Sequence, residues 1–306
     1  GKLDPPCPGK SQGTQPNPDR ESGLERRHMS KVRHHNPGLL FNQSAEEYHA
    51  DMGASASRLN RMFKKSPAHM RHDLENPKEP TQAMVIGTAT HSAILEPDLF
   101  EKEWGRIPVG DGRSKEIKEA KANLVSEFGR DNILKAEVYD GIVGMRESVL
   151  GHARAADLLS EANTEVSSYW TDEKTGVQCK ARIDAMPCQD SGWGYCLVDI
   201  KTTADASARE FQRSVYNFGY HRQAAHYLAS TADKVFGRDR FIFIVVERDS
   251  PHCVAVYELD SDALALARAE LDDLLGTWGE CEVDGGWPSY PEDIQELSLP
   301  GWAYTR

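Results

Sequence analysis

The sequence has no long apolar run, and this excludes a helix that crosses a membrane. The chain has 306 residues, and its longest purely apolar stretch is only Phe241–Val246. A helix that spans a bilayer needs about 20 apolar residues. The amino terminus also lacks the apolar core of a secretory signal. We therefore expect a soluble protein of the cytoplasm without a membrane partner.

Motifs of several common enzyme classes are also missing. The chain has no Walker P-loop and no H-E-x-x-H helix motif, so nothing in it supports a P-loop nucleotide hydrolase or a zinc protease. Its six cysteines form no C-x-x-C pair and no spacing typical of zinc or of an iron–sulfur quartet. We expect reduced and mostly buried thiols. The cysteines are Cys7, Cys179, Cys188, Cys196, Cys253 and Cys281.

Positive charge is in the minority. The 36 lysines and arginines face 48 aspartates and glutamates, which gives a formal net charge of −12. This balance argues against a general nucleic-acid coat protein. It leaves a nuclease open, because cations can be clustered in a local channel and a bound metal offsets the carboxylates of a site.

Two groups of cations are candidates for contact with DNA. Arg58, Arg61 and Lys65 recur at spacings of three and four and would share one face of a helix. An ordinary solvated helix face is the alternative interpretation of this spacing. Lys180 and Arg182 belong to the polar row of a predicted strand, and we expect them to contact DNA as well.

The chain divides into a tail and one domain. Residues 1–40 are rich in Pro, Gly, Gln, Asn and Ser without hydrophobic periodicity, which predicts a flexible tail. Its His28-Met29-Ser30 junction resembles a cloning scar, so part of it is expected to derive from a vector. Residues 41–306 are predicted to form a single domain, with a helical part over 46–160 and a sheet with further helices over 164–280.

Hydrophobic periodicity predicts an α/β (α+β) fold with a central mixed sheet flanked by helices. The predicted strands are 164–170, 177–186, 195–202, 241–247 and 253–259. The predicted helices are 46–74 with a break at Ser66-Pro67, 84–95, two or three within 115–160, 206–231, and 262–278 with Asp260 or Ser261 as its cap. In the first helix, Leu59, Met62 and Phe63 form the apolar face.

Two of the predicted strands carry a catalytic pattern. Asp199 and Lys201 are two residues apart and project from the same face of a strand. In the preceding strand Asp184 belongs to a polar row that alternates with apolar residues. Pairing of these strands would bring two carboxylates and an ammonium group into one cleft. Phosphodiester cleavage uses such a set, since carboxylates hold Mg²⁺ and a lysine orients the attacking water. A surface hairpin with an Asp-Lys pair is the alternative.

Further residues complete the candidate site. The carbonyl of Ile200 would add an oxygen ligand for the metal. Gln223 and Tyr227 are four apart on one helix face, where they could contact the substrate phosphate or support Lys201; a helix surface with a packed tyrosine is the alternative. By spacing alone, His91 fits a hydrogen-bonded structural histidine better than a ligand. A histidine ligand would suit Mn²⁺ better than Mg²⁺ and predicts activity with either ion.

Several of these segments together resemble a known family. The resemblance is to the carboxy-terminal nuclease domain of the RecE-type exonucleases (exonuclease VIII), in the RecB branch of the PD-(D/E)XK superfamily, and it extends from about Tyr48 to Trp302. The segments that carry it are Gly87–Pro97, Ser168–Asp184, Val198–Asp205, Tyr220–Tyr227 and Leu297–Trp302. The long amino-terminal region of some family members is absent, which is compatible with a compact phage or prophage enzyme or with an excised domain.

The resemblance implies roles for individual residues. It makes His91, Asp184 and Asp199 metal ligands, Lys201 the catalytic lysine, and Gln223 with Tyr227 the Q-x-x-x-Y pair of the branch. It further implies 5′-to-3′ digestion of linear double-stranded DNA, a restriction-endonuclease-like core, a ring-shaped homo-oligomer and partnership with a single-strand annealing protein of the RecT type.

Two alternatives remain open at this point. A structure-specific endonuclease of the same superfamily would have the same catalytic core, because the core does not define how DNA is presented. A recombination scaffold that binds DNA ends without cleaving them would need a decayed site, whereas the expected catalytic residue types are all present.

Overall fold

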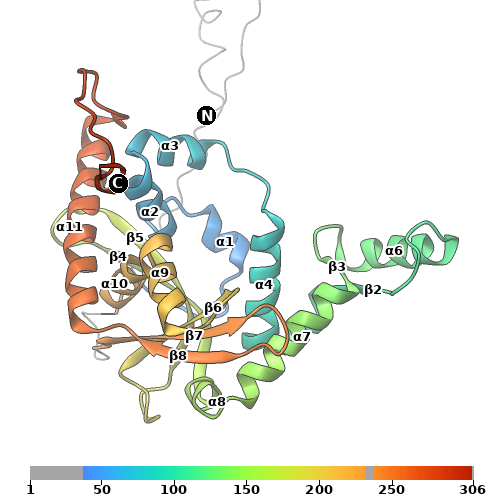
Figure 1. Cartoon of the computed structure of the whole chain (residues 1–306). Coiled ribbons are helices and arrows are strands. Elements are labelled where there is room, and N and C mark those ends of the chain that lie inside the picture. The colour runs from blue at the N-terminus through green and yellow to red at the C-terminus, as the bar shows by residue number, and fades with distance from the viewer. Residues whose placement is uncertain (1–36, 232–236, 305–306) are drawn as a thin grey trace, which may run out of the picture. The chain divides into compact units, whose positions relative to one another are not determined.

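The sheet at the centre of the protein is mixed, as the sequence predicts. The computed structural model describes residues 37–231 and 237–304, which belong to the compact unit 34–306. The strands follow the order β1-β4-β5-β6-β7-β8, in which β6 and β7 are parallel and the other neighbours antiparallel (Figure 1). The strands are β1 (Gly38–Leu40), β4 (Ala162–Thr171), β5 (Gln178–Pro187), β6 (Cys196–Thr203), β7 (Arg240–Glu247) and β8 (Val254–Glu258).

Helices cover both faces of this sheet. One face packs against α4 (Gln82–Leu95), α7 (Ala136–Gly151) and α8 (Ala153–Ser160) through a core of aliphatic side chains. The other face packs against α9 (Ala208–Phe218), α10 (Tyr220–Ala229) and α11 (Ser261–Asp284). The parallel neighbours β6 and β7 are joined through α9 and α10, because a parallel pair needs a crossover connection.

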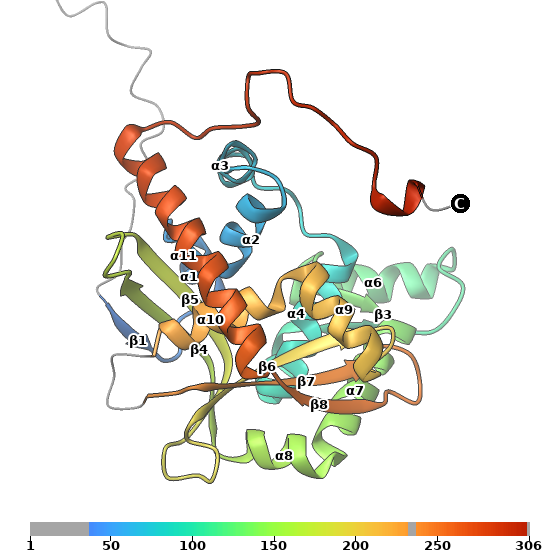
Figure 2. The same ribbon diagram turned by 60° about the vertical axis from the view of Figure 1, so that its left-hand side comes forward.

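The remaining elements lie around this core. The helices α2 and α3 pack against α11 through a third apolar cluster, which lies on the side of the sheet covered by α11 (Figure 2). A second, two-stranded sheet pairs β2 with β3 in parallel, and Figure 1 shows it with α6 extending past the end of α7. The elements are α1 (Ala45–Ala50), α2 (Ala56–Lys64), α3 (Pro67–Glu75), α5 (Pro97–Glu103), β2 (Gly105–Ile107), α6 (Lys115–Phe128), β3 (Ile133–Lys135) and the 3₁₀ turn η1 (Gly301–Ala303).

The predicted helix 46–74 is divided once more than expected. The break at Ser66-Pro67 is confirmed: α3 begins at Pro67, and the Ser66 side chain accepts a hydrogen bond from the His69 backbone N–H. A second break separates α1 from α2, because the intervening loop forms a bridge from Ala54 to Cys179 of β5. The predicted apolar face is wrong for Phe63, which is 45% exposed.

The predicted helix 206–231 is also interrupted, at Gly219. This residue has φ 73°, a left-handed conformation that costs glycine little. A Cβ atom there would lie 2.3 Å from Asn60 Oδ1. Gly219 therefore ends α9 and starts α10, which turns the following helix toward the sheet.

Asp260 rather than Ser261 caps the N-terminus of α11, since the Asp260 side chain accepts a hydrogen bond from the Ala263 N–H.

The predicted tail of residues 1–40 falls mainly outside the described residues, which begin at residue 37. Within residues 37–40 the prediction is wrong, because Gly38–Leu40 forms β1 and pairs with β4. The prediction missed this strand because three residues are too few for a periodic pattern.

No helix in residues 37–231 and 237–304 has the length and apolarity to cross a bilayer. The five cysteines in this part of the chain are free, and three are buried.

Helix α1 covers the polar row of β5, so that this row is internal. The Lys180 side chain is 2% exposed, and its Nζ donates to the backbone carbonyls of Tyr48 at 2.6 Å and Asp51 at 2.7 Å. The same ammonium lies 4.4 Å from the centroid of the Tyr48 ring. Burial, and next the charge of Arg58, lower the pKa of Lys180 to about 7. Lys180 thus fastens the carboxyl end of α1 to the sheet, where α-helical carbonyls lack intrahelical donors.

Replacing Lys180 tests this attachment. We expect Lys180→Met to lower the free energy of unfolding by about 1–3 kcal/mol, because the carbonyls of Tyr48 and Asp51 each lose a charged donor. The carbonyls keep only their hydrogen bonds from the Asp51 N–H and from Arg58, while the apolar side chain still fills the space. Urea denaturation followed by circular dichroism measures the change. The matched control is Lys174→Met, since Lys174 is exposed and pairs with Asp272 at the surface. Equal stability of Lys180→Met and the unchanged protein would contradict the assigned role.

Candidate metal and catalytic centre

The centre lies where β5 and β6 stop pairing. Their ladder is limited to the residue pair Ala185 and Val198. One step further, the Asp184 carboxylate takes the place of a strand carbonyl, and its Oδ2 accepts the Ile200 N–H at 2.8 Å. Asp199 lies in the middle of β6, which remains paired with β7 along its whole length. The opening between β5 and β6 therefore has a carboxylate on each side.

Three side chains from three elements converge at this opening. His91 of α4, Glu165 of β4 and Asp184 of β5 each offer one ligand atom, and these atoms all lie within 4.8 Å of one another. His91 Nδ1 is 3.3 Å from Asp184 Oδ2. One imidazole nitrogen and two carboxylate oxygens are a donor set that suits Mg²⁺ or Mn²⁺. The residues present therefore fit a divalent metal, and the sequence analysis had proposed His91 and Asp184 as two of its ligands.

Glu165 is the member of this group that the sequence analysis missed. Its backbone has φ 51°, a left-handed conformation that non-glycine residues rarely adopt and that costs about 1–3 kcal/mol. An ion pair with Arg182 from the adjacent strand holds the carboxylate in place. The only signal in the sequence was a single acid within the predicted strand 164–170, which does not distinguish a ligand from a surface residue.

Burial sets the protonation of the three candidate ligands. Burial, and next the negative charge of Asp199, raise the pKa of the Asp184 carboxyl well above its ordinary value. Burial, and next Asp184, likewise raise the pKa of Glu165. Burial, and next the positive charge of Lys201, lower the pKa of His91. Neutral imidazole is the ligating form, so the environment of His91 favours binding of a metal.

Asp199 forms the second part of the centre, together with Lys201 and Gln223. Lys201 Nζ lies 2.6 Å from Asp199 Oδ2, and Gln223 Nε2 donates to Asp199 Oδ1 at 2.7 Å. Burial by itself lowers the pKa of Lys201, but the charges of Asp199 and Asp184 outweigh it, and the pKa is raised. The ammonium is therefore charged at neutral pH and is held at one place.

Tyr227 supports this arrangement from within the core. Its side chain is buried, its hydroxyl interacts with Gln223, and burial raises its pKa well above the ordinary value. It is thus placed to orient Gln223 rather than to contact substrate phosphate. The aromatic ring next to the Lys201 ammonium is that of Tyr220, whose centroid lies 4.6 Å from Lys201 Nζ. The sequence analysis did not single out Tyr220, although it is three residues before Gln223.

Asp199 and Ile200 are placed differently from the three convergent ligands. The oxygens of Asp199 face Lys201 and Gln223, so its role as a metal ligand stays a prediction. The backbone carbonyl of Ile200 acts as a hydrogen-bond acceptor toward the His91 ring, which places that carbonyl beside the cluster. Its ligation of a metal also stays a prediction.

Most of the cations predicted to contact DNA instead pair with carboxylates or backbone carbonyls of this chain. The prediction is wrong for Lys180, which is buried under α1. Arg182 is also committed internally, since its guanidinium pairs with Glu165 and donates to the Gln43 carbonyl at 3.0 Å. Polar alternation suggested an exposed row, but α1 and its preceding segment cover it. Tertiary contacts of this kind override a local pattern.

Arg58 and Arg61 of α2 and the adjacent Lys65 make different contacts. Arg58 Nη1 donates to the carbonyls of Asp51 at 3.0 Å and Gly53 at 2.6 Å, which ties it to the loop before α2. Arg61 pairs with Asp73 of α3 at 2.7 Å. Lys65 is exposed and pairs with no carboxylate among the described residues. Contact with DNA stays a prediction for Arg61 and Lys65.

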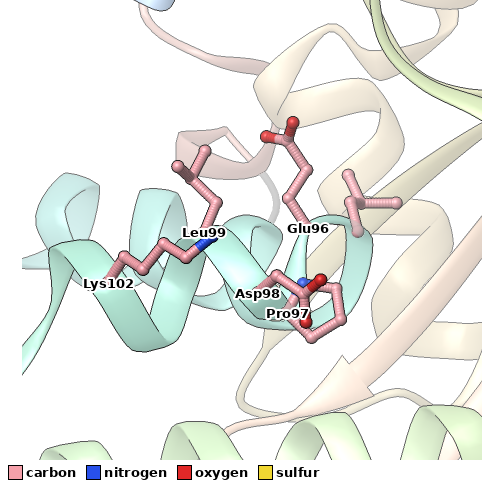
Figure 3. A pocket seen from close by; sticks show the side chains of 6 residues that line it. Glu96, Pro97, Asp98, Leu99 and Lys102 are labelled. Carbon is pink, nitrogen blue, oxygen red and sulfur yellow. The ribbon is translucent and has the colours of Figure 1, made fainter.

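A hollow of about 400 Å³ lies at the corner between α4 and α5. Glu96, Pro97 and Lys102 contribute to its lining, and Figure 3 shows Glu96 pointing away from Asp98. Burial, and next the charge of Glu165, raise the pKa of Glu96. The Glu96 carboxyl therefore lies close enough to Glu165 for the two charges to interact.

Comparisons with known proteins agree with this architecture. The family model described as "PDDEXK-like domain of unknown function (DUF3799)" matches residues 55–300. A crystal structure described as a "putative exonuclease" from Eubacterium rectale is similar, with a TM-score of 0.57 and 13% identity, over 87% of this chain and 99% of that chain. At this identity the likeness concerns the fold alone. A search of curated proteins found no match.

Glu165 should contribute to metal affinity. We expect Glu165→Gln to weaken binding of Mn²⁺ to the metal-free protein by roughly ten-fold or more, because one of the three convergent ligands loses its charge. Isothermal titration calorimetry measures the dissociation constant. Glu161→Gln is the matched control, since Glu161 is exposed immediately before the same strand. An unchanged dissociation constant for Glu165→Gln would exclude the ligand role.

The raised pKa values of Asp184 and Glu165 predict a pH dependence. Above the ordinary pKa of a carboxyl group, the folded metal-free protein binds more protons than the unfolded chain, so its stability falls as the pH rises toward the raised values. A bound divalent ion removes this penalty. We expect the difference between melting temperatures with Mn²⁺ and with EDTA to grow from about pH 5 to about pH 8. A constant difference would contradict the prediction.

Proposed function

The chain belongs to the family of PDDEXK-like domains, and we propose that it is a metal-dependent nuclease that hydrolyses DNA. One observation carries the proposal: the ligand cluster of His91, Glu165 and Asp184 faces the pair of Asp199 and Lys201 across the opening between β5 and β6. Phosphodiester hydrolysis needs both parts, since one neutralises the phosphate and the other handles the attacking water.

Each part has a definite task in this proposal. A divalent ion held by His91, Glu165 and Asp184 would neutralise phosphate charge and lower the pKa of a water molecule. Lys201 keeps its proton because Asp199 and Asp184 raise its pKa, so it can donate a hydrogen bond to the water or the developing oxyanion. Gln223 holds Asp199 in place and thereby fixes the direction of the ammonium.

More specifically, we propose that the enzyme digests linear double-stranded DNA in the 5′-to-3′ direction. This digestion would leave 3′ single strands for annealing-type recombination. The RecE-type resemblance of the segments around His91, Asp184 and Lys201 supports this choice. The fold similarity to the structure described as a "putative exonuclease" agrees with it. A ring-shaped homo-oligomer and a RecT-type annealing partner rest on the same resemblance. The preference for Mg²⁺ or Mn²⁺ rests on the carboxylate and imidazole donors of the cluster.

Replacement of Lys201 tests the reaction. We expect Lys201→Ala to lower the rate of DNA hydrolysis by at least about 100-fold, because the donor beside the scissile phosphate is lost. Release of label from linear duplex DNA labelled at the 5′ or the 3′ end measures the rate, with Mg²⁺ or with EDTA. Lys174→Ala controls for loss of a surface lysine, and circular dichroism controls for folding. A wild-type rate in Lys201→Ala would refute the proposed role.

The same assay separates the alternatives. Early release of the 5′ label, with covalently closed circular DNA left intact, supports the exonuclease. Cleavage of the circle identifies a structure-specific endonuclease of the same superfamily instead. Binding to DNA ends without hydrolysis under any metal condition identifies a scaffold and overturns the enzymatic proposal.

A further inference from the structure

Two large aromatic side chains are exposed where α2 and the end of α9 meet. Phe63 on α2 is 45% exposed, and Phe218 at the end of α9 is 56% exposed. We call these residues the aromatic ridge. Neither the ligand cluster nor the Asp199–Lys201 pair uses them. Large rings exposed in one group cost hydration free energy, which is typical of a surface that contacts a ligand or partner.

The ridge is held rigidly by polar contacts beneath it. Asn60 Nδ2 donates to the Phe218 carbonyl at 2.9 Å, and Asn60 Oδ1 accepts from Arg222 Nη2 at 2.7 Å. The Arg222 guanidinium in turn lies 3.8 Å from the centroid of the Phe63 ring. These contacts join the end of α9 to α2. Their rigidity reduces the conformational entropy that the ridge would lose on binding.

The ridge is continuous with the catalytic centre. The rings of Phe218 and Tyr220 have centroids 5.6 Å apart, and the centroid of Tyr220 lies 4.6 Å from Lys201 Nζ. Two contacts therefore connect an exposed ring to the lysine that would act at the scissile phosphate. A nucleotide next to that phosphate would lie within reach of the ridge.

Positive charge accompanies the rings. Lys64 Nζ lies 5.6 Å from the centroid of Phe218, and both Lys64 and Lys65 are exposed. Neither lysine pairs with a carboxylate within residues 37–231 and 237–304. In a chain of net charge −12, such a pair favours an anionic ligand. Exposed rings with adjacent cations bind single-stranded nucleic acid, because bases stack on the rings and phosphates meet the cations.

From these observations we infer that the aromatic ridge binds unpaired nucleotides next to the scissile phosphate. Bases inside a duplex stack on one another and present no free face, so only a frayed end or single-stranded overhang can use the ridge. The inference rests on the proposed nuclease function, and it adds that the enzyme separates the end of its substrate at this surface. Phe218 is the central residue, because it contacts both Lys64 and Tyr220.

The test measures binding of unpaired nucleotides without turnover. The probe is a duplex with a short single-stranded overhang that contains 2-aminopurine, in Ca²⁺, and stacking on an aromatic ring quenches its fluorescence. We expect Phe218→Ala to lose the quenching and to bind the overhang roughly 5- to 100-fold more weakly. Phe218→Trp should restore both. Tyr290→Ala removes an exposed ring that lies against His69, and it should leave both unchanged.

The possible outcomes distinguish failure of the ridge proposal from failure of the nuclease proposal. If the wild-type protein hydrolyses linear DNA while Phe218→Ala quenches and binds as before, the ridge proposal fails and the nuclease proposal stands. If the wild-type protein hydrolyses no DNA but loses quenching with Phe218→Ala, the nuclease proposal fails and the ridge still binds unpaired bases. If Phe218→Ala changes the sedimentation of the protein without changing DNA binding, the ridge is a contact between copies of this chain, and the inference is overturned.

Discussion

The loss of pairing between β5 and β6 is the constraint on which the centre depends. If the ladder continued past Ala185 and Val198, the backbone N–H of Ile200 would meet a strand carbonyl and no space would remain for side chains. Instead the Asp184 carboxylate accepts that N–H. The buried backbone donor is satisfied, and the same carboxylate is turned toward His91 and Glu165. One hydrogen bond thus both ends the pairing and positions a ligand.

The internal use of cations explains how an acidic chain can hold so many buried carboxylates. Lys180, Arg182 and Arg222 are each committed to carbonyls or carboxylates within the fold. Arg182 and Lys201 offset Glu165 and Asp199 directly. Removing one partner of a buried ion pair costs about 3–5 kcal/mol, so these cations are not free for DNA. In the proposed function, a bound metal and a few exposed lysines such as Lys64 and Lys65 would attract the phosphate backbone.

Periodicity predicted the parts of this structure that depend on neighbours along the chain. Asp199 and Lys201 share a strand face because they are two apart, and Gln223 and Tyr227 share a helix face because they are four apart. Glu165 could not be found in this way, since its left-handed backbone and its pairing with Arg182 depend on the adjacent strand.

Residues whose exposure depends on distant segments were predicted least well. Lys180 follows an alternating pattern that indicates an exposed side chain, but α1, from a segment more than 100 residues earlier in the sequence, covers it. Phe63 follows a helical pattern that indicates burial, yet the packing of α2 against α3 and α11 uses Leu59 and Met62 and leaves the ring outside. Such errors are informative, because a large apolar side chain left at the surface calls for a functional explanation. In this protein the ring of Phe63 and the guanidinium of Arg222 lie together, so the contact that stabilises the junction of α2 and α10 also holds this exposed ring in place.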